Sequence, residues 1–447
     1  MLAVVLQFLL SRHVLEAVGV TKPPNVHVAT LLLCIGAVYS LTHGVVPLSH
    51  WLRKAPGLML FLAGIPALML YSVYFNGLRG WTVFIETFLS AGLLALLLEP
   101  ASVRQRQLLG RILMGLVLVN CVVGLYESAI HEQLFPADYD PDATDAEREQ
   151  ILEEFRAQGF YEHPLSASAI TSIAFFLLYS MRMRFITAAL AFGLMLIGMF
   201  AFGGRTSLAV MAIVSVLAAL YALIAGLVKR RLRPDLVQAV VTAAIAVPIV
   251  VVVVVTQTST ADRIVENLNL SNDTSAAVRV TQWEIFHLLD LQQWLFGISK
   301  DQLAAMKYRI GLGGNYTDIE NPWILLFLDL GVVGFAVFMT VMMTFIVHLG
   351  RFTRSLNGWL IIISSLIVQS SSNSLGVSTN ELMLEVAFLM ALSGFRDYRP
   401  VAALSGRSRA LPGLRRMAGA SGGLRLAAAP MQTLRGLAIR PQSGLRP

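Results

Sequence analysis

The sequence places a carboxylate, an amide and a proline directly before an apolar run, in the stretch ENPWILLFLDLGVVG at residues 320–334. Proline is favoured in the first turn of a helix, because its missing N–H would have no partner there. Asn321 is therefore predicted to cap a helix that begins at Pro322, with the Glu320 carboxylate beyond the helix end. Glu320 either has no role beyond starting the helix or is a general base that takes a proton from a hydroxyl group.

Two further polar sites lie at the ends of apolar runs. His163 directly precedes Pro164 and is a second candidate base, although a lone histidine can equally be structural. Arg205, in the turn GGRTS, joins two apolar runs that have almost no loop between them. It is either an anchor whose charge reaches the lipid headgroups or a fixed cation beside the phosphate of an anionic lipid substrate. The preceding glycines and the dipole of the following helix favour the phosphate interpretation.

These sites are spaced along a chain with the composition of a helical membrane protein. Of its 447 residues, 56% are hydrophobic and 14% are charged, and its apolar runs of roughly 16 to 24 residues match a helix that crosses about 30 Å of hydrocarbon. The sequence predicts an all-α polytopic membrane protein with 11 or 12 transmembrane helices over residues 1–395. The runs lie near residues 28–48, 57–76, 81–98, 109–129, 164–181, 185–202, 206–227, 236–256, 322–347, 358–377 and 381–395, and residues 1–20 are a weak additional segment.

Basic residues indicate the orientation of these helices. If the helices alternate, six basic connections fall on one face, which the positive-inside rule makes cytoplasmic. The opposite face then receives two long loops, at about residues 130–163 and 257–321, together with Glu320, His163 and Arg205. Residues 396–447 are rich in arginine and are predicted to be a disordered cytoplasmic tail that contacts anionic lipid. Function is therefore expected on the extracytoplasmic face.

Each long loop is predicted to contain a helix. In the first loop, capping-box spacing from Thr144 and a short apolar stripe favour a surface helix that ends at Gly159. In the second loop, residues 275–297 have the pattern of one amphipathic helix. Arg279 and Trp283 would share a face of that helix and lie at the membrane interface.

Several protein classes are excluded by what the sequence lacks. Cys34 and Cys121 both lie within apolar runs, so neither a disulfide framework nor a metal cluster is expected. The sequence contains no HExxH, P-loop or CxxC. The net charge of +7 comes from the arginine-rich C-terminal residues, so a nucleic-acid partner is not expected. We predict no metal and no cofactor, and an enzyme of this design would use an already activated, membrane-bound donor.

Four motifs occur in a fixed order over about residues 105–395. They are GFYEHPLSAS (159–168), GGRTS (203–207), RVTQW (279–283) with FGIS (296–299), and ENPWILLFLDLGVVG (320–334). Their order and spacing resemble the O-antigen ligase and polymerase superfamily, the multi-span enzymes of bacterial surface-polysaccharide assembly. Two positions depart from that pattern, because Glu320 replaces a frequent histidine and Leu165 replaces an asparagine. These departures resemble the exopolysaccharide-polymerase branches more than the lipopolysaccharide ligases.

The resemblance implies a metal-independent glycosyltransferase in the bacterial inner (plasma) membrane, with a polyprenyl-diphosphate-linked oligosaccharide as donor. It implies that arginines bind the diphosphate while a base activates an acceptor hydroxyl, and bidentate phosphate contacts suit Arg205 and Arg279. Glu320 or His163 would be the base. Further substrate contacts are expected from Arg156, Trp283, Arg309 and Asn321.

Three functions fit these expectations. A polymerase that joins lipid-linked repeat units is favoured, and a ligase that moves finished glycan to a lipid or other acceptor is the close alternative. A flippase is the alternative of a different class, because the polar stretch QSSSNS at residues 369–374 is typical of an unwound helix end. Expected partners are the lipid-linked donor, a glycan acceptor, membrane lipids and other polysaccharide-assembly proteins.

Overall fold

The fold was analysed in a computed structural model of the chain. It describes residues 1–10, 14–15, 26–43, 48–77, 81–135, 155–161, 163–181, 183–228, 281–311, 319, 321–370 and 381–396. The chain divides into two compact units, Met1–Asp397 and Tyr398–Pro447. All described residues belong to the first unit, so the predicted tail lies outside them except for Arg396.

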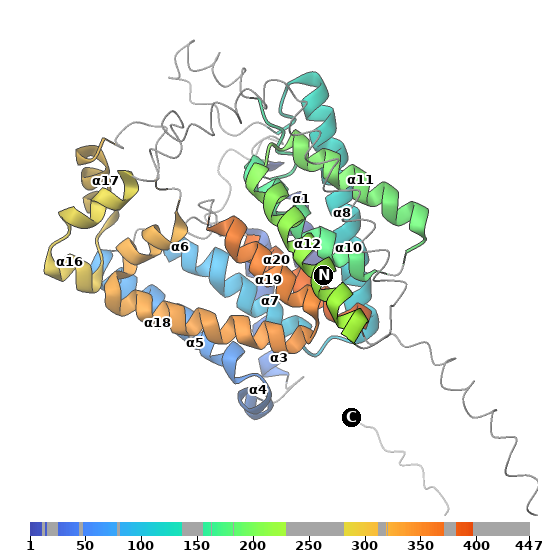
Figure 1. The fold of residues 1–447 in the computed structure, drawn as a ribbon. Coiled ribbons are helices and arrows are strands. Elements are labelled where there is room, and N and C mark those ends of the chain that lie inside the picture. Colours follow the sequence, from blue (N-terminus) through green and yellow to red (C-terminus); the bar gives the residue numbers. More distant parts are fainter. Residues whose placement is uncertain are drawn as a thin grey trace, which may run out of the picture. The chain divides into compact units, whose positions relative to one another are not determined.

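All regular elements in the described part of the chain are helices, which confirms the all-α prediction (Figure 1). They are α1 (Leu2–Leu9), α3 (Val28–Thr42), α4 (Leu48–Lys54), α5 (Pro56–Asn76), α6 (Trp81–Val83), the π-helical η1 (Phe84–Leu89), α7 (Ser90–Leu98), α8 (Val103–Ile130), α10 (Pro164–Ser180), α11 (Phe185–Ala201), α12 (Arg205–Val228), the 3-10 helix η2 (Gln282–Leu288), α16 (Leu291–Phe296), α17 (Lys300–Arg309), α18 (Pro322–Thr353), α19 (Leu356–Gln369) and α20 (Glu381–Arg396).

Long apolar helices make the chain a polytopic membrane protein. Four segments are long and apolar enough to cross a membrane: α5, Trp81–Leu98, α8 and α18. Shorter apolar helices lie at the positions of most of the other predicted runs. The run at 236–256 lies outside the described residues, so the number of spans stays a prediction.

One predicted segment differs from the structure, and the weak segment at residues 1–20 is described only in part. The helix expected over residues 28–48 ends at Thr42, and a separate helix, α4, begins at Leu48. At the N-terminus, α1 has only 8 residues. At 1.5 Å per residue it extends about 12 Å, so α1 alone cannot cross the hydrocarbon layer.

The helix α20 forms the centre of the bundle. Every residue from Glu381 to Gly394 is buried, and a helix buried on all sides must be surrounded by other elements. It packs against α8, α10, α7, α18 and α19. The polar start of α20 is therefore held inside the protein.

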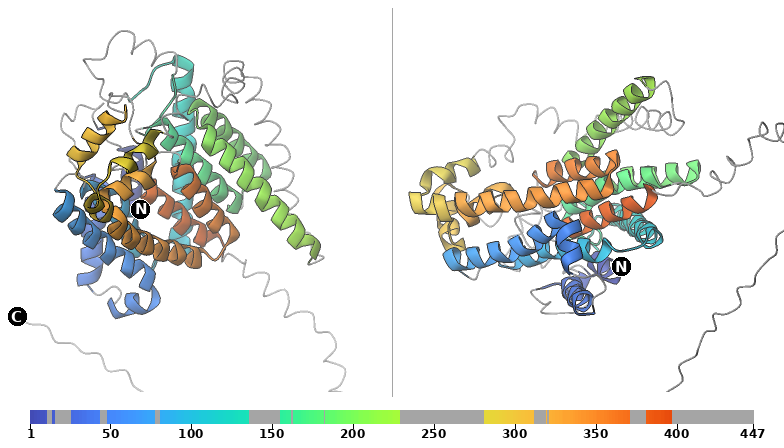
Figure 2. Two further views of the ribbon diagram at one scale, coloured as in Figure 1. Left: turned by 60° about the vertical axis from the view of Figure 1, so that its left-hand side comes forward. Right: turned by 90° about the horizontal axis from the view of Figure 1, so that it is seen from below.

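The helices α5 and α18 pack against each other in antiparallel orientation and lie side by side in Figures 1 and 2. Near one end of the pair Gly57 lies against Thr344, and towards the other end Tyr71 lies against Gly334. Small residues let the two backbones approach closely, which is how apolar helices associate in a membrane.

The helix α18 is broken at Gly331, which has φ +61° and ψ −179°. The carbonyls freed by the break all have partners: Leu328 accepts from the Ile298 N–H at 2.7 Å, Asp329 from the Asn76 amide, and Leu330 from the Tyr71 hydroxyl at 3.1 Å. The helix predicted over residues 322–347 is thus present as α18, with a break at Gly331 that the sequence analysis did not predict. A residue with a side chain is strained at this φ, and the break anchors the segment that contains α16 and α17.

Candidate functional site

His163 caps α10, which begins at Pro164 within the run predicted over residues 164–181. Its ring nitrogen Nδ1 accepts the N–H of Leu165 at 3.2 Å, and the side chain is exposed. The helix begins at Pro164 and places His163 at the surface, where a substrate can reach it. An imidazole that accepts this bond through Nδ1 keeps its other nitrogen directed away from the helix end.

The turn between α11 and α12 packs directly on α10. A Cβ atom added to Gly204 would lie 1.8 Å from the Ser168 hydroxyl oxygen, so only glycine allows this approach. Ser168 also donates to the Gly204 carbonyl at 3.4 Å. Since Arg205 is the first residue of α12, its backbone is fixed beside the first turns of α10. The Arg205 side chain lies outside the described atoms.

Arg156 approaches the same turn from the first long loop. The Ala157 N–H donates to the Ala201 carbonyl at 3.1 Å, and the Arg156 Cδ atom lies 3.1 Å from where a Cβ on Gly203 would be. Residues 155–158 form no helix, so the predicted surface helix does not extend to Gly159. The structure thus brings Arg156 and Ser168 of α10 to the turn that precedes α12, while His163 caps the start of α10.

Two polar residues of α8 hold this loop in place. Glu127 is fully buried and accepts the N–H groups of Leu134, Gln158 and Gly159 at 3.0, 2.9 and 2.8 Å. Asn120, seven residues before Glu127 on α8, accepts the Phe160 N–H at 2.8 Å. Our sequence analysis missed both residues, although polar side chains seven positions apart within an apolar run are a usable signal.

Replacing Glu127 with alanine is expected to release the loop. Two of the three N–H groups that it binds are buried, and leaving each without an acceptor costs about 1–3 kcal/mol. We expect a lower Tm in detergent and a lower rate of glycan transfer. Glu132→Ala removes the same charge from an exposed position and serves as the control. Equal Tm and rate in the two variants would contradict the anchoring role.

Asn321 caps α18, as predicted. Its side-chain oxygen accepts the N–H groups of Trp323 at 2.9 Å and Ile324 at 3.4 Å. The Trp323 indole donates to the Ser370 hydroxyl at 2.8 Å, which ties the start of α18 to the end of α19. Glu320, directly before Asn321, lies outside the described residues, and so does Arg279.

The end of α19 lies at the same end of the bundle as the start of α10. Asn357, at the start of α19, donates to Ser180 at the end of α10 with a separation of 2.7 Å. The two packed helices therefore run in opposite directions. His163, Arg205 and Asn321 thus all belong to helix starts at one end of the bundle, as the topology prediction required.

Two buried carboxylates lie near the start of α20 and were missed by the sequence analysis. Glu381 is 4% exposed and Glu385 is 5% exposed, and the Gln369 amide donates to Glu385. Burial, and then the negative charge of Glu381, raises the pKa of the Tyr161 phenol well above its ordinary value, so Tyr161 stays neutral. Ionisable side chains inside a membrane bundle are costly and mark functional positions.

The predicted amphipathic helix over residues 275–297 is wrong in its described part. A 3-10 helix, η2, ends at Leu288, and a new helix, α16, begins after Asp290. The cause is a capping box, in which Asp290 accepts the Gln293 N–H at 2.8 Å and the Gln293 side chain accepts the Asp290 N–H at 3.0 Å. Two short elements therefore replace one helix.

Trp283 and Arg309 belong to this second loop segment, and both are exposed. Trp283 lies 5.6 Å from Phe286, which in turn contacts Phe327 of α18 at 5.3 Å between ring centroids. Arg309 is the last residue of α17. This segment is anchored on α5 and α18, whereas His163 and Arg156 gather around α10.

These features define a multi-pass helical membrane protein with cationic and proton-accepting groups at one end of its bundle. Residues 190–339 match the family described as O-antigen ligase. The match includes the α11–α12 turn and the start of α18, and it confirms the resemblance to the O-antigen ligase and polymerase superfamily. That family comprises glycosyltransferase-like enzymes of polysaccharide assembly. No curated protein matches the chain.

Proposed function

We propose that this protein is a polymerase that joins polyprenyl-diphosphate-linked oligosaccharide repeat units. The observation that carries the proposal is the packing of the α11–α12 turn, within the matched segment, against the start of α10 and Arg156. This arrangement places the Arg156 guanidinium group beside the positive start of α12, and His163 caps the helix on which the turn packs. Such a cluster suits a lipid-linked diphosphate.

In the proposed reaction, a hydroxyl of the acceptor glycan attacks the anomeric carbon of the donor sugar. Glu320 takes the hydroxyl proton, with His163 as the alternative base. The bond between the anomeric carbon and the diphosphate oxygen breaks as the new glycosidic bond forms, so the configuration inverts. Polyprenyl diphosphate leaves with the bonding electrons, and Arg205, Arg279 and Arg156 neutralise its charge. The scheme needs no metal ion.

A ligase reaction has a specific observation in its favour, because the matched family is described as O-antigen ligase. The chemistry would be the same, with a different acceptor. Polymerisation is preferred because Glu320 and Leu165 depart from the superfamily pattern in the direction of exopolysaccharide polymerases. A flippase is disfavoured, because the carbonyls freed by the break in α18 are bonded to protein groups instead of lining a substrate path.

We further propose that the site faces the periplasm of the bacterial inner membrane and that the C-terminus is cytoplasmic. The support is the charge distribution. Lys54, Arg106, Arg351 and Arg354 lie at the end of the bundle opposite to His163 and Asn321. Positive residues are retained on the cytoplasmic side of such proteins.

One experiment tests both the reaction and the orientation. Purified protein is reconstituted, and sealed vesicles of known orientation receive lipid-linked repeat units from outside. A ladder of product lengths in vesicles with His163 outward is the expected result. A single transfer to a lipid acceptor would identify a ligase, and absence of any new glycosidic bond would refute both transfer reactions. Elongation only in vesicles of the opposite orientation would refute the periplasmic site.

A further inference from the structure

A cavity lies at the other end of the bundle from the candidate site. It has a volume of about 790 Å³ and is formed by the ends of α4, α5, α7, α8, α18 and α20. It lies at the C-terminal end of α18, which Asn321 caps at its other end and which is long enough to cross a membrane. The cavity is therefore at headgroup level on the opposite side of the membrane.

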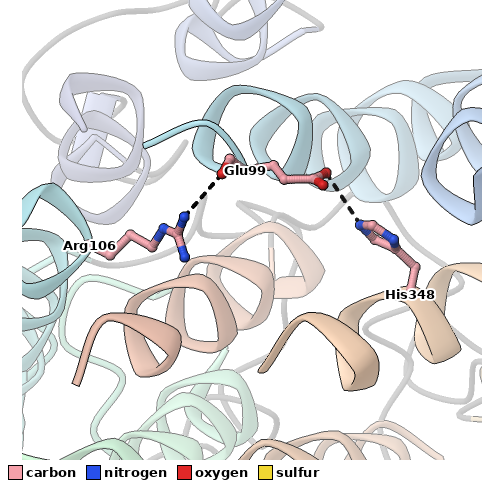
Figure 3. Close-up of polar contacts among 3 residues, drawn as sticks. All are labelled: Glu99, Arg106 and His348. Atoms are coloured by element: carbon pink, nitrogen blue, oxygen red, sulfur yellow. Dashed lines mark hydrogen bonds and ion pairs between the residues drawn. The ribbon is translucent and has the colours of Figure 1, made fainter. Parts of the chain in front are cut away.

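The one acid among the described residues that line this cavity, Glu99, already has a partner. Its carboxylate lies 3.5 Å from the His348 ring, and its backbone carbonyl accepts from Arg106 at 3.0 Å (Figure 3). Arg106 also donates to the Ala101 carbonyl at 2.7 Å and to the Ser393 hydroxyl at 3.0 Å. Arg106 and Glu99 therefore fix the wall where α7, α8 and α20 meet.

Three further cations line the cavity: Lys54, Arg351 and Arg354. All three are exposed, and none forms an ion pair with a residue in the described part of the chain. They come from two elements, α4 and the end of α18, so the fold brings them together around one opening. Because these like charges line one cavity, they repel one another, and an anion between them would remove that cost.

An apolar wall continues from these cations along the outside of the bundle. It contains Leu60, which is 46% exposed, and Met343, which is 52% exposed, with Val347 beside them. A free anion would make no use of this wall. A phospholipid matches both features of the cavity. Its phosphate can bind the cations, and its acyl chains can cover the exposed apolar side chains.

We propose that this cavity binds the phosphate of an anionic phospholipid headgroup. Lys54, Arg351 and Arg354 contact the phosphate oxygens, and the acyl chains lie along Leu60, Met343 and Val347. The site is separate from glycan transfer and does not depend on which side of the membrane it faces. Its role is to hold α4 and the start of α5 against the end of α18 at the headgroup level.

Native mass spectrometry of the purified full-length protein tests the proposal by measuring bound phosphatidylglycerol and phosphatidylcholine. The wild-type protein should retain more phosphatidylglycerol than phosphatidylcholine. Each cation near an anionic headgroup contributes about fivefold in affinity, so Lys54→Gln with Arg351→Gln should weaken phosphatidylglycerol binding roughly 25-fold and leave phosphatidylcholine binding unchanged. The matched control is Arg53→Gln with Arg104→Gln, which removes two exposed charges outside the cavity.

Three outcomes would overturn the proposal. An equal loss in the control variant would show that general surface charge, and not the cavity, attracts the lipid. Unchanged phosphatidylglycerol binding in Lys54→Gln/Arg351→Gln would exclude these cations. Displacement of phosphatidylglycerol by millimolar inorganic phosphate would identify a free-phosphate site instead. The charge-conserving variant Lys54→Arg/Arg351→Lys should keep the lipid preference, which separates loss of binding from loss of folding.

Discussion

Replacing Glu320 with glutamine is expected to slow glycan transfer by about 10²–10⁴-fold, the contribution typical of a general base. Glutamine keeps the size and hydrogen-bonding capacity of the side chain but cannot accept the hydroxyl proton. The helix start does not depend on Glu320, because the Asn321 side chain caps α18 and Pro322 begins it. The variant should therefore fold, insert and bind lipid-linked donor normally. Transfer rates and donor binding by the purified variant are the measurements.

A matched pair of His163 variants separates the second candidate base from its capping role. Because His163 accepts the Leu165 N–H, alanine would remove both the cap and the base. Asparagine is itself a favoured cap residue, so His163→Asn removes only the base. If Glu320 is the base, His163→Asn should retain most of its transfer rate. If Glu320→Gln has the wild-type transfer rate and His163→Asn is inactive, then His163, and not Glu320, is the general base.

Local signals made the helix starts predictable. Proline after His163 and after Asn321 marks α10 and α18, because the rules for a first helical turn involve only neighbouring residues. The same reasoning failed in the second loop, where the apolar period continues past Asp290. There a local capping box begins a new helix, and it outweighs the periodicity.

Tertiary partners explain what the sequence could not show. The functions of Asn120 and Glu127 depend on residues 155–161 folding back onto α8, and no pattern within α8 specifies that contact. Likewise, the burial of Glu381 follows from α20 being surrounded by other helices. The break at Gly331 required Tyr71 and Ile298 as partners for the freed carbonyls. Such features arise from pairs of distant segments and need the structure.

Replacing Arg205 with lysine is expected to lower transfer about 10- to 100-fold, the effect of losing a charge-assisted hydrogen bond. Lysine keeps the positive charge and the long apolar stem, so an arginine that only anchors α12 in the headgroups would be replaced without loss. A diphosphate bound by two nitrogens of a planar guanidinium group would lose one of its two contacts. The measurements are kcat and donor KM of the purified variant, with insertion checked by its Tm.

Arg184→Lys is the matched control for this substitution, because Arg184 is exposed and precedes α11 at the opposite end of that helix from the GGRTS turn. It should leave transfer unchanged. Arg156→Lys tests the second guanidinium at the turn, since the Arg156 stem lies against Gly203 just before Arg205. If both arginines hold one diphosphate, the double variant should lose less than the product of the two single losses, because each single change already disturbs the shared ligand. Wild-type kcat and KM in Arg205→Lys would reduce Arg205 to a headgroup anchor and leave Arg156 and Arg279 to neutralise the leaving group.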